Sequence, residues 1–129
     1  DIAVLVAAVA DWRTEAAPTK MKKGAGGPPA LALVENPDIL AGLARHPARP
    51  ALLVGFAAET DALLPNAQAK LARKGCDLIV ANDVSGDVMG GDRNLVHLVA
   101  PGGVESLPEG SKEDVAARLA ARLADRLNG

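Results

Sequence analysis

The stretch NAQAKLARKGCDLIVAN, residues 66–82, contains both the end of a helix and a buried strand. Gly75 is placed to close the helix, and the last turns carry Lys70, Arg73 and Lys74, where cations interact favourably with the helix dipole. Residues 77–82 then form an apolar run, which is typical of a strand covered on both faces. The stretch therefore predicts a helix lying on a covered, parallel sheet.

Three further apolar runs have the length and composition of strands: residues 2–8, 51–57 and 94–100. The last of them follows a glycine-rich turn at residues 89–94. A helix is predicted to begin with Asn36 as its N-cap and Pro37 in its first position. Pro65 is expected to mark a kink or the true start of the next helix. The alternation of strands and helices predicts one α/β layered domain over residues 1–129.

The C-terminal segment reads as an amphipathic helix. Ser111 is predicted to cap it, with Asp114 three residues on. Apolar residues at i, i+4 spacing are expected to form the buried stripe: Val115, Leu119, Leu123 and Leu127. Basic residues at the same spacing are expected to face solvent: Arg118, Arg122 and Arg126.

Composition narrows the possible functions. The formal net charge of −2 argues against a general nucleic-acid binder or an anionic-membrane binder. No apolar run approaches the roughly 20 residues of a membrane helix, and the apolar start lacks the basic region of a signal peptide. Cys76 is the only cysteine, so we expect a buried free thiol, no intrachain disulfide and a cytoplasmic location.

Several familiar sites find no support in the sequence. There is no GxGxxG after the first strand, no P-loop and no nucleophile elbow, and His46 and His97 have no partner at metal-ligand spacing. What remains is cations: Lys20, Lys22 and Lys23 in one loop, and Lys70 with Lys74 one helical turn apart. With a helix start they could bind a nucleotide triphosphate, or they could simply be solvated.

Other residues at strand ends also allow two interpretations. Phe56, in GFAAET, could flank a base or could be a core phenylalanine. Asn82 and Asp83 lie where substrate pockets form, but an Asx turn explains them equally well. Asp92 and Arg93 fit turn residues better than ligands.

Six segments together resemble one known family. They are AAVADW (7–12), KMKK (20–23), NPDIL (36–40), VGFAAET (54–60), KLARKGCDLIVANDVS (70–85) and NLVHL (94–98). Their order and spacing resemble bacterial phosphopantothenoylcysteine synthetase, usually the C-terminal half of a bifunctional coenzyme A biosynthesis protein. The resemblance covers essentially the whole chain. It implies a three-layer Rossmann-like domain with a mainly parallel sheet and a lysine-bearing flap.

The resemblance also implies an activity and its residues. Family members use CTP to convert the carboxylate of 4′-phosphopantothenate into an acyl-cytidylate, from which the amine of cysteine displaces CMP. Lys20 would be catalytic and Mg²⁺ would accompany CTP. The residues implied to bind the nucleotide are Ala7, Ala8, Asp11, Lys20, Pro37, Asp38, Ile39, Leu40, Phe56, Lys70 and Lys74. The segment GAGGPP (24–29) would then supply the hinge of the flap.

The family further implies a homodimer and a missing part. A glycine-rich first segment, whose Asn stabilises the acyl-cytidylate, has no counterpart here, so the N-terminal part of the family fold is expected to be absent. FMN would be present only if an upstream decarboxylase domain exists in the parent protein. Two readings follow: a CTP-dependent ligase, or a truncated nucleotide-binding and dimerisation module without turnover. A relative that binds another nucleotide is a third.

Overall fold

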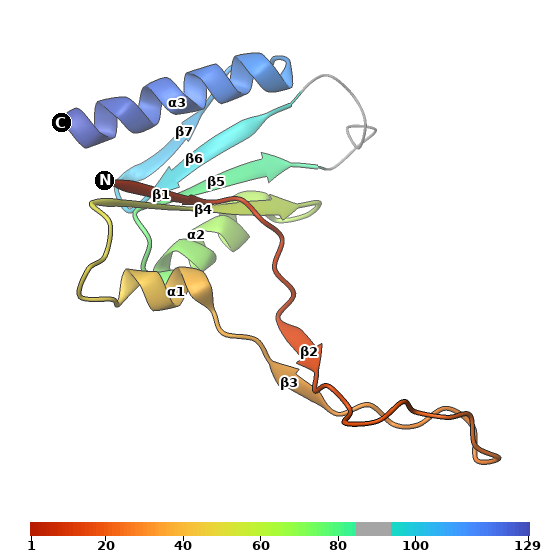
Figure 1. The fold of residues 1–129 in the computed structure, drawn as a ribbon. Coiled ribbons are helices and arrows are strands. Elements are labelled where there is room, and N and C mark those ends of the chain that lie inside the picture. Colours follow the sequence, from red (N-terminus) through yellow and green to blue (C-terminus); the bar gives the residue numbers. More distant parts are fainter. Residues whose placement is uncertain (85–93) are drawn as a thin grey trace. The chain divides into compact units, whose positions relative to one another are not determined.

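The computed structural model describes residues 1–84 and 94–129 (Figure 1). They form two compact units, one of residues 1–6 and 39–129 and one of residues 7–38. The expected turn residues Asp92 and Arg93 lie outside the described residues. In the described part of the chain, no helix is long and apolar enough to cross a membrane.

The larger unit is built on a sheet with strand order β1-β4-β5-β6-β7. Its strands are β1 (Ile2–Leu5), β4 (Leu52–Glu59), β5 (Leu78–Asp83), β6 (Val96–Ala100) and β7 (Gly103–Ser106). β1, β4 and β5 pair in parallel, β6 is antiparallel to β5, and β7 is antiparallel to β6. In the described sheet only β6 therefore runs opposite to the others, which confirms the mainly parallel prediction.

Helices cover both faces of this sheet (Figure 1). α1 (Ile39–Ala44) and α2 (Leu63–Lys74) pack on one face, where Leu53, Ile79 and Val99 are fully buried. α3 (Lys112–Asn128) covers the other face, over a second cluster that includes Val54 and Val80. Successive side chains of β4 and β5 alternate between the two clusters, because strand side chains point to opposite faces. The three-layer α/β prediction is confirmed.

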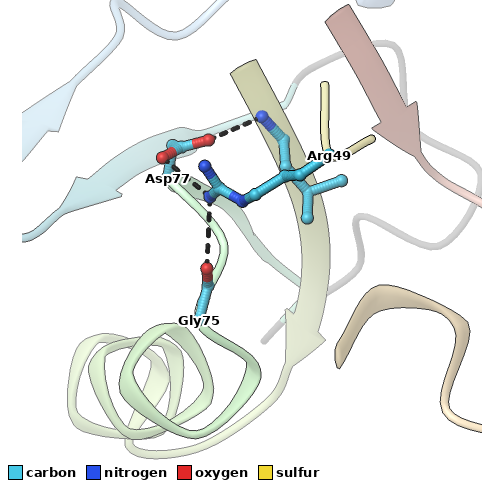
Figure 2. A network of polar contacts seen from close by, with 4 residues as sticks. Arg49, Gly75 and Asp77 are labelled. Atoms are coloured by element: carbon cyan, nitrogen blue, oxygen red, sulfur yellow. Dashed lines mark hydrogen bonds and ion pairs between the residues drawn. The ribbon is translucent and has the colours of Figure 1, made fainter. Parts of the chain in front are cut away.

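In residues 66–82, the turn between α2 and β5 forms as the sequence predicts. Gly75 ends α2 with φ 71° and its N–H bonds to the Leu71 oxygen. The guanidinium of Arg49 donates to the Gly75 oxygen at 3.2 Å and to Asp77 Oδ1 at 2.9 Å, contacts drawn as dashed lines in Figure 2. Asp77 Oδ2 accepts a hydrogen bond from the Leu53 N–H at 2.7 Å. One carboxylate thus ties the start of β5 to the start of β4.

β1 differs from its prediction. The run at residues 2–8 is expected to be a buried strand, but β1 ends at Leu5 and forms the edge of the sheet. Ile2 and Val4 are 36% and 39% exposed, because only one neighbour, β4, pairs with β1 in the described sheet.

α3 is predicted correctly at its start and less well at its end. Ser111 caps it by accepting a hydrogen bond from the Asp114 N–H at 3.1 Å. Val115 and Leu123 are buried, but Leu127 is 42% exposed, so its place in the buried stripe is wrong. The helix extends past the core at that point. Arg122 and Arg126 are exposed, as expected, and Arg118 is half-buried. Arg118 donates to the Pro108 oxygen, and Arg122 forms an exposed ion pair with Glu105.

The smaller unit, residues 7–38, contains an antiparallel ribbon of β2 (Trp12–Thr14) and β3 (Leu33–Glu35). Arg13 Nη1 reinforces it with hydrogen bonds to the Glu35 oxygen and to Asn36 Oδ1. The segment between the strands turns back on itself at an isolated bridge between Gly24 and Gly27. Gly27 has φ 85°, a left-handed conformation that favours glycine.

Candidate functional site

Lys70 and Phe56 meet where the pairing between β1 and β4 ends. That ladder finishes at Leu5 opposite Gly55, and the next carbonyl oxygen of β4, that of Phe56, accepts a 2.7 Å hydrogen bond from Lys70 Nζ. The contact is half-buried. Lys74 lies one turn further along the same face of α2. The structure therefore brings together two expected nucleotide-binding residues, and holds an ammonium group where the β1–β4 pairing ends.

The Phe56 side chain points to the face of the sheet covered by α3. It is half-buried and packs against the cluster that contains Val54 and Val80. Packing against this cluster therefore explains why part of the Phe56 ring is buried. The expected contact of the ring with a base stays a prediction. Ile39 is exposed, whereas Leu40 is buried beneath β4. Leu40 could therefore reach a ligand only through its main chain.

Gly55 explains why small residues occur in the GFAAET segment. A Cβ atom built on Gly55 would lie 2.6 Å from Leu40 Cδ2 and 3.1 Å from Ile79 Cδ1. Contacts under 3 Å require a shift of the neighbouring atoms. The absence of a side chain at Gly55 therefore lets Leu40 of α1 pack directly on β4, whatever the segment also does for a ligand.

Asn36 joins two other expected ligand-binding segments within the smaller unit. Its side chain donates to the Ala10 oxygen at 2.7 Å, and its backbone N–H donates to the Asp11 oxygen at 2.8 Å. These bonds place Ala10 and Asp11, the end of the AAVAD segment that begins with Ala7 and Ala8, beside Asn36. Pro37 and Asp38 follow Asn36 in the sequence. The segments are separated by the whole β2–β3 ribbon in sequence.

The prediction that Asn36 caps the first helix is wrong, because its side chain has other partners. α1 begins at Ile39, so Asn36 and Pro37 precede it and Asp38 is the residue before its first position. The Asn36 carboxamide is already engaged by Ala10 and Arg13, and so cannot cap the helix. Its sequence signal, Asn before Pro, is shared by caps and by turns.

Lys20, Lys22 and Lys23 are exposed on the segment that leads from β2 to the Gly24–Gly27 bridge. They belong to the smaller unit, whereas Phe56, Lys70 and Lys74 belong to the larger one. The role of Lys20 and the hinge role of the following glycines stay predictions. In the described residues, no group of three His, Cys, Asp or Glu side chains could hold a metal ion.

The carboxyl end of β5 holds polar atoms that the sequence explains less well. Asn82 Oδ1 and Asn94 Nδ2 are buried without a hydrogen-bond partner. Nothing in the sequence singles out Asn94, because a polar residue before a strand is common.

Two cavities of about 420 and 470 Å³ lie near the turn after β6, around Gly103. The larger is also lined by Cys76, whose thiol pKa is raised by burial.

Comparisons of the sequence with family models and with known proteins point to the same family. Residues 1–127 match the family model described as the DNA/pantothenate metabolism flavoprotein C-terminal domain. The chain is 45% identical over 141 aligned residues to the coenzyme A biosynthesis bifunctional protein CoaBC of Mycobacterium bovis, covering 100% of this chain and 34% of that protein. It is 45% identical over 112 residues to CoaBC of Escherichia coli K12, covering 83% of this chain and 28% of that protein.

Solved structures agree with this assignment. The crystal structure of the C-terminal domain of CoaBC superposes with a TM-score of 0.70 at 30% identity, covering 97% of this chain and 55% of that one. The DNA/pantothenate metabolism flavoprotein from Streptococcus pneumoniae shares the fold, with a TM-score of 0.61 at 23% identity over 75% of this chain and 42% of that one. The chain spans about a third of the length of the curated relatives it matches. It belongs to the DNA/pantothenate metabolism flavoprotein C-terminal domain family, and is similar to the C-terminal domain of CoaBC.

Proposed function

We propose that this chain takes part in the CTP-dependent ligation of 4′-phosphopantothenate to cysteine in coenzyme A biosynthesis. The observation that carries the proposal is 45% identity, across the whole chain, to proteins named for coenzyme A biosynthesis. The reaction itself comes from the family resemblance of the sequence motifs, and the contacts of Lys70 and Asn36 are compatible with it.

The proposed reaction has two steps. A carboxylate oxygen of 4′-phosphopantothenate attacks the α-phosphorus of CTP, and the bond to pyrophosphate breaks. The amine nitrogen of cysteine then attacks the acyl carbon of the acyl-cytidylate, the bond to CMP breaks, and the amine loses its proton to solvent. Negative charge spreads over the phosphoryl oxygens in the first step, and positioned cations and N–H groups stabilise it.

Lys70 suits that role because its contact leaves capacity for a ligand. An ammonium group has three donors, and the Phe56 oxygen accepts one of them. In the proposal Lys70 and Lys74 contact the triphosphate, Lys20 acts at the reacting phosphoryl group, and residues 37–40 contribute main-chain N–H groups. Asp11 and the main chain of Ala7 and Ala8 contact the base or ribose.

Magnesium enters the proposal only as the partner of CTP. Mg²⁺ often binds through substrate phosphates and keeps several waters, and we assign it no protein ligand. It would reduce the repulsion between the triphosphate and the attacking carboxylate. FMN stays a prediction that concerns a decarboxylase domain outside this chain.

Calorimetric titration with CTP and Mg²⁺, run beside ATP, tests the nucleotide half of the proposal. We expect saturable CTP binding that is tighter than ATP binding and that weakens roughly 10- to 100-fold in a Lys20→Ala, Lys70→Ala variant. A Lys112→Ala, Arg126→Ala variant changes the net charge equally on α3 and should bind as the parent does. If ATP binds as tightly as CTP, the alternative of a relative that binds another nucleotide is favoured. If the folded chain does not bind CTP, the proposal is contradicted.

Turnover separates the ligase from its alternative, a nucleotide-binding and dimerisation module. Pyrophosphate release that requires 4′-phosphopantothenate would identify the first step, and CMP release that requires cysteine would identify the second. Binding of CTP without either release would favour the module.

We also propose that the chain forms a homodimer through residues 7–38. Five large apolar side chains of this unit are more than half exposed: Val9, Trp12, Met21, Leu31 and Leu33. Such a concentration is typical of an interaction surface. Analytical ultracentrifugation should give a dimer for the parent chain and a shift toward monomer for a Trp12→Ser, Leu33→Ser variant. A monomeric parent chain at micromolar concentration would contradict this part.

A further inference from the structure

Arg13 and Asn36 form a chain of hydrogen bonds within the smaller unit, which we call the Arg13–Asn36 clamp. Arg13 Nη1 donates to the Glu35 oxygen at 2.9 Å and to Asn36 Oδ1 at 3.1 Å. Asn36 Nδ2 donates in turn to the Ala10 oxygen at 2.7 Å. The guanidinium nitrogen has two hydrogens, so it can serve both of its acceptors at once. The clamp therefore joins the end of β3 to the segment that precedes β2.

The clamp extends the β2–β3 ribbon toward the segments expected to bind the nucleotide. The ladder of the ribbon ends with Trp12 opposite Glu35, so the next position places Asn36 opposite Asp11. The Asn36 N–H donates to the Asp11 oxygen at 2.8 Å. Asp11 is one of the expected nucleotide-binding residues, and residues 37–38 follow directly in the sequence. Two such segments, far apart in sequence, are thus held to one residue.

The backbone of the ribbon alone gives these segments little support. Its ladder has three residue pairs, and an isolated two-stranded ribbon is marginally stable in water. Residues 7–10 are exposed and belong to no helix or strand. A segment that must be ordered when the ligand arrives costs conformational entropy, whereas a segment already held in its bound geometry does not. Side-chain hydrogen bonds to residue 10 therefore favour binding.

Arg13 also determines which way the Asn36 carboxamide points. A guanidinium group can only donate, so it selects the oxygen Oδ1 and leaves Nδ2 directed at the Ala10 oxygen. Without the arginine, the carboxamide could rotate and exchange the positions of its donor and acceptor. The charge of Arg13 further strengthens the hydrogen bond to Oδ1. The arginine therefore controls the contact with Ala10, although the two residues are not bonded to each other.

We propose that Arg13 is a positioning residue for nucleotide binding, which acts through Asn36 by holding the main chain around Asp11. The inference rests on the proposed function, in which Asp11 and the main chain of residues 7–8 contact the base or ribose. Arg13 itself contacts no ligand. Residues that bind a ligand do so best when their neighbours hold them in the required geometry.

The clamp is on the opposite side of the ribbon from the apolar residues proposed for the dimer. Arg13 lies between Trp12 and Thr14 in β2, and strand side chains alternate in direction. Leu33 pairs with Thr14, so Leu33 and Trp12 share one face and Arg13 projects to the other. Replacing Arg13 should therefore leave the proposed dimer contact in place. The oligomeric state then serves as a control for damage to the ribbon.

Calorimetric titration with CTP and Mg²⁺ tests the inference through a double-mutant cycle. We expect Arg13→Met and Asn36→Ala each to weaken CTP binding roughly 3- to 10-fold, because the lost hydrogen bonds are exposed to water. The double variant should bind no more weakly than the weaker single variant, since the arginine acts through Asn36. Arg13→Lys keeps the charge and a donor, and should restore most of the affinity. Arg126→Met, an exposed change of the same kind on α3, should bind as the parent does.

Amide hydrogen exchange tests the positioning directly, without any nucleotide. The Asn36 N–H donates to the Asp11 oxygen, so it should exchange roughly 3- to 10-fold faster in Arg13→Met than in the parent chain. Arg126→Met should leave this rate unchanged. The melting temperature of Arg13→Met should equal that of the parent, because the clamp belongs to the smaller unit and not to the cores around the sheet.

The failure of the inference is distinguishable from the failure of the proposed function. Unchanged CTP affinity or unchanged Asn36 exchange in Arg13→Met, in a parent chain that binds CTP, would overturn the inference alone. Additive losses in the double variant would also overturn it, and would assign Arg13 to direct contact with the ligand. A loss of affinity that comes with a lower melting temperature or a changed oligomeric state would overturn it as general damage. If the folded parent chain binds no CTP, the proposed function fails and the inference fails with it.

Discussion

Lys70 Nζ lies 2.7 Å from the main-chain oxygen of Phe56, which is the first carbonyl of β4 beyond the last residue paired with β1. Lys70 therefore has two functions that can be separated by experiment: it donates to a half-buried carbonyl, and it places a cation where the β1–β4 pairing ends. The four-carbon stem of lysine suits both, since it can pack along the sheet while the ammonium stays accessible.

Replacing Lys70 by Met should reduce both stability and nucleotide affinity. Met keeps the stem but not the donor, so we expect a loss of about 1 kcal/mol in the free energy of unfolding. Urea titration measures it. Lys112→Met, on the exposed first turn of α3, is the matched control and should change stability by less than about 0.5 kcal/mol. An unchanged Lys70→Met variant would show that water replaces the lysine at the Phe56 carbonyl.

The two glycines of α1 and β4 should respond oppositely to alanine. Gly55→Ala forces a methyl group against Leu40 and Ile79, and should destabilise the fold by about 1–3 kcal/mol. Gly42→Ala, in the helix that carries Leu40, meets nothing within 4 Å and should stabilise it by about 0.5–1 kcal/mol. Thermal unfolding of the two variants checks the pair. Equal effects of the two substitutions would contradict the close packing of α1 on β4.

Replacing Asp77 should destabilise the fold more than replacing Glu105, although the exposed ion pair of Glu105 is the shorter one. Asp77→Ala leaves the Leu53 N–H without its partner and removes the ion pair of Arg49, which keeps its hydrogen bond to the Gly75 oxygen (Figure 2). We expect it to cost about 2 kcal/mol. Glu105→Ala removes only the exposed pair with Arg122, 2.6 Å long, and should cost less than about 1 kcal/mol. Chemical denaturation gives both values. The reverse order would mean that the β4–β5 connection does not depend on this carboxylate.

Cys76 should make stability sensitive to high pH. Burial raises the pKa of its thiol above the ordinary value, so the folded chain holds the proton more tightly than the unfolded chain. This contribution is complete below the unfolded pKa of about 8.5 and is lost as the pH rises through the folded pKa. The stability difference between the parent and Cys76→Ala should therefore shrink between pH 7 and pH 10.

The same burial predicts slow chemical modification. Iodoacetamide reacts with the thiolate, so at pH 8 Cys76 should react at least roughly 10-fold more slowly in the folded chain than in urea. A native rate equal to the denatured rate would contradict a buried thiol.

Among the glycines near Lys20, Gly27 should be the sensitive one. Its φ of 85° costs an alanine about 1–2 kcal/mol, whereas Gly24 and Gly26 do not have a positive φ and would place a methyl group in open space. If the segment positions Lys20, Gly27→Ala should lower pyrophosphate release or CTP affinity and the other two should not. Parallel kinetics and titration of the three variants test this, and unchanged values for Gly27→Ala would remove the hinge role.

Part of this structure could be read from local sequence. The Gly75 end of α2 and the Ser111 cap of α3 depend on hydrogen bonds within a few residues, and the apolar runs of β4 and β5 depend on their own composition. The same kind of reading fails at Asn36, because its cap signal is local but its actual partners, Ala10 and Arg13, are brought to it by the β2–β3 ribbon.

The sequence by itself determined the layered α/β class, the C-terminal end of α2, the start of α3 and the family, because these follow from periodicity, capping and ordered motifs. Only the tertiary structure decided that β1 is an edge, that Leu40 packs on Gly55, that Lys70 meets Phe56, and that Asn82 and Asn94 each have a buried atom without a partner. These relations depend on strand order and register, which join residues far apart in sequence.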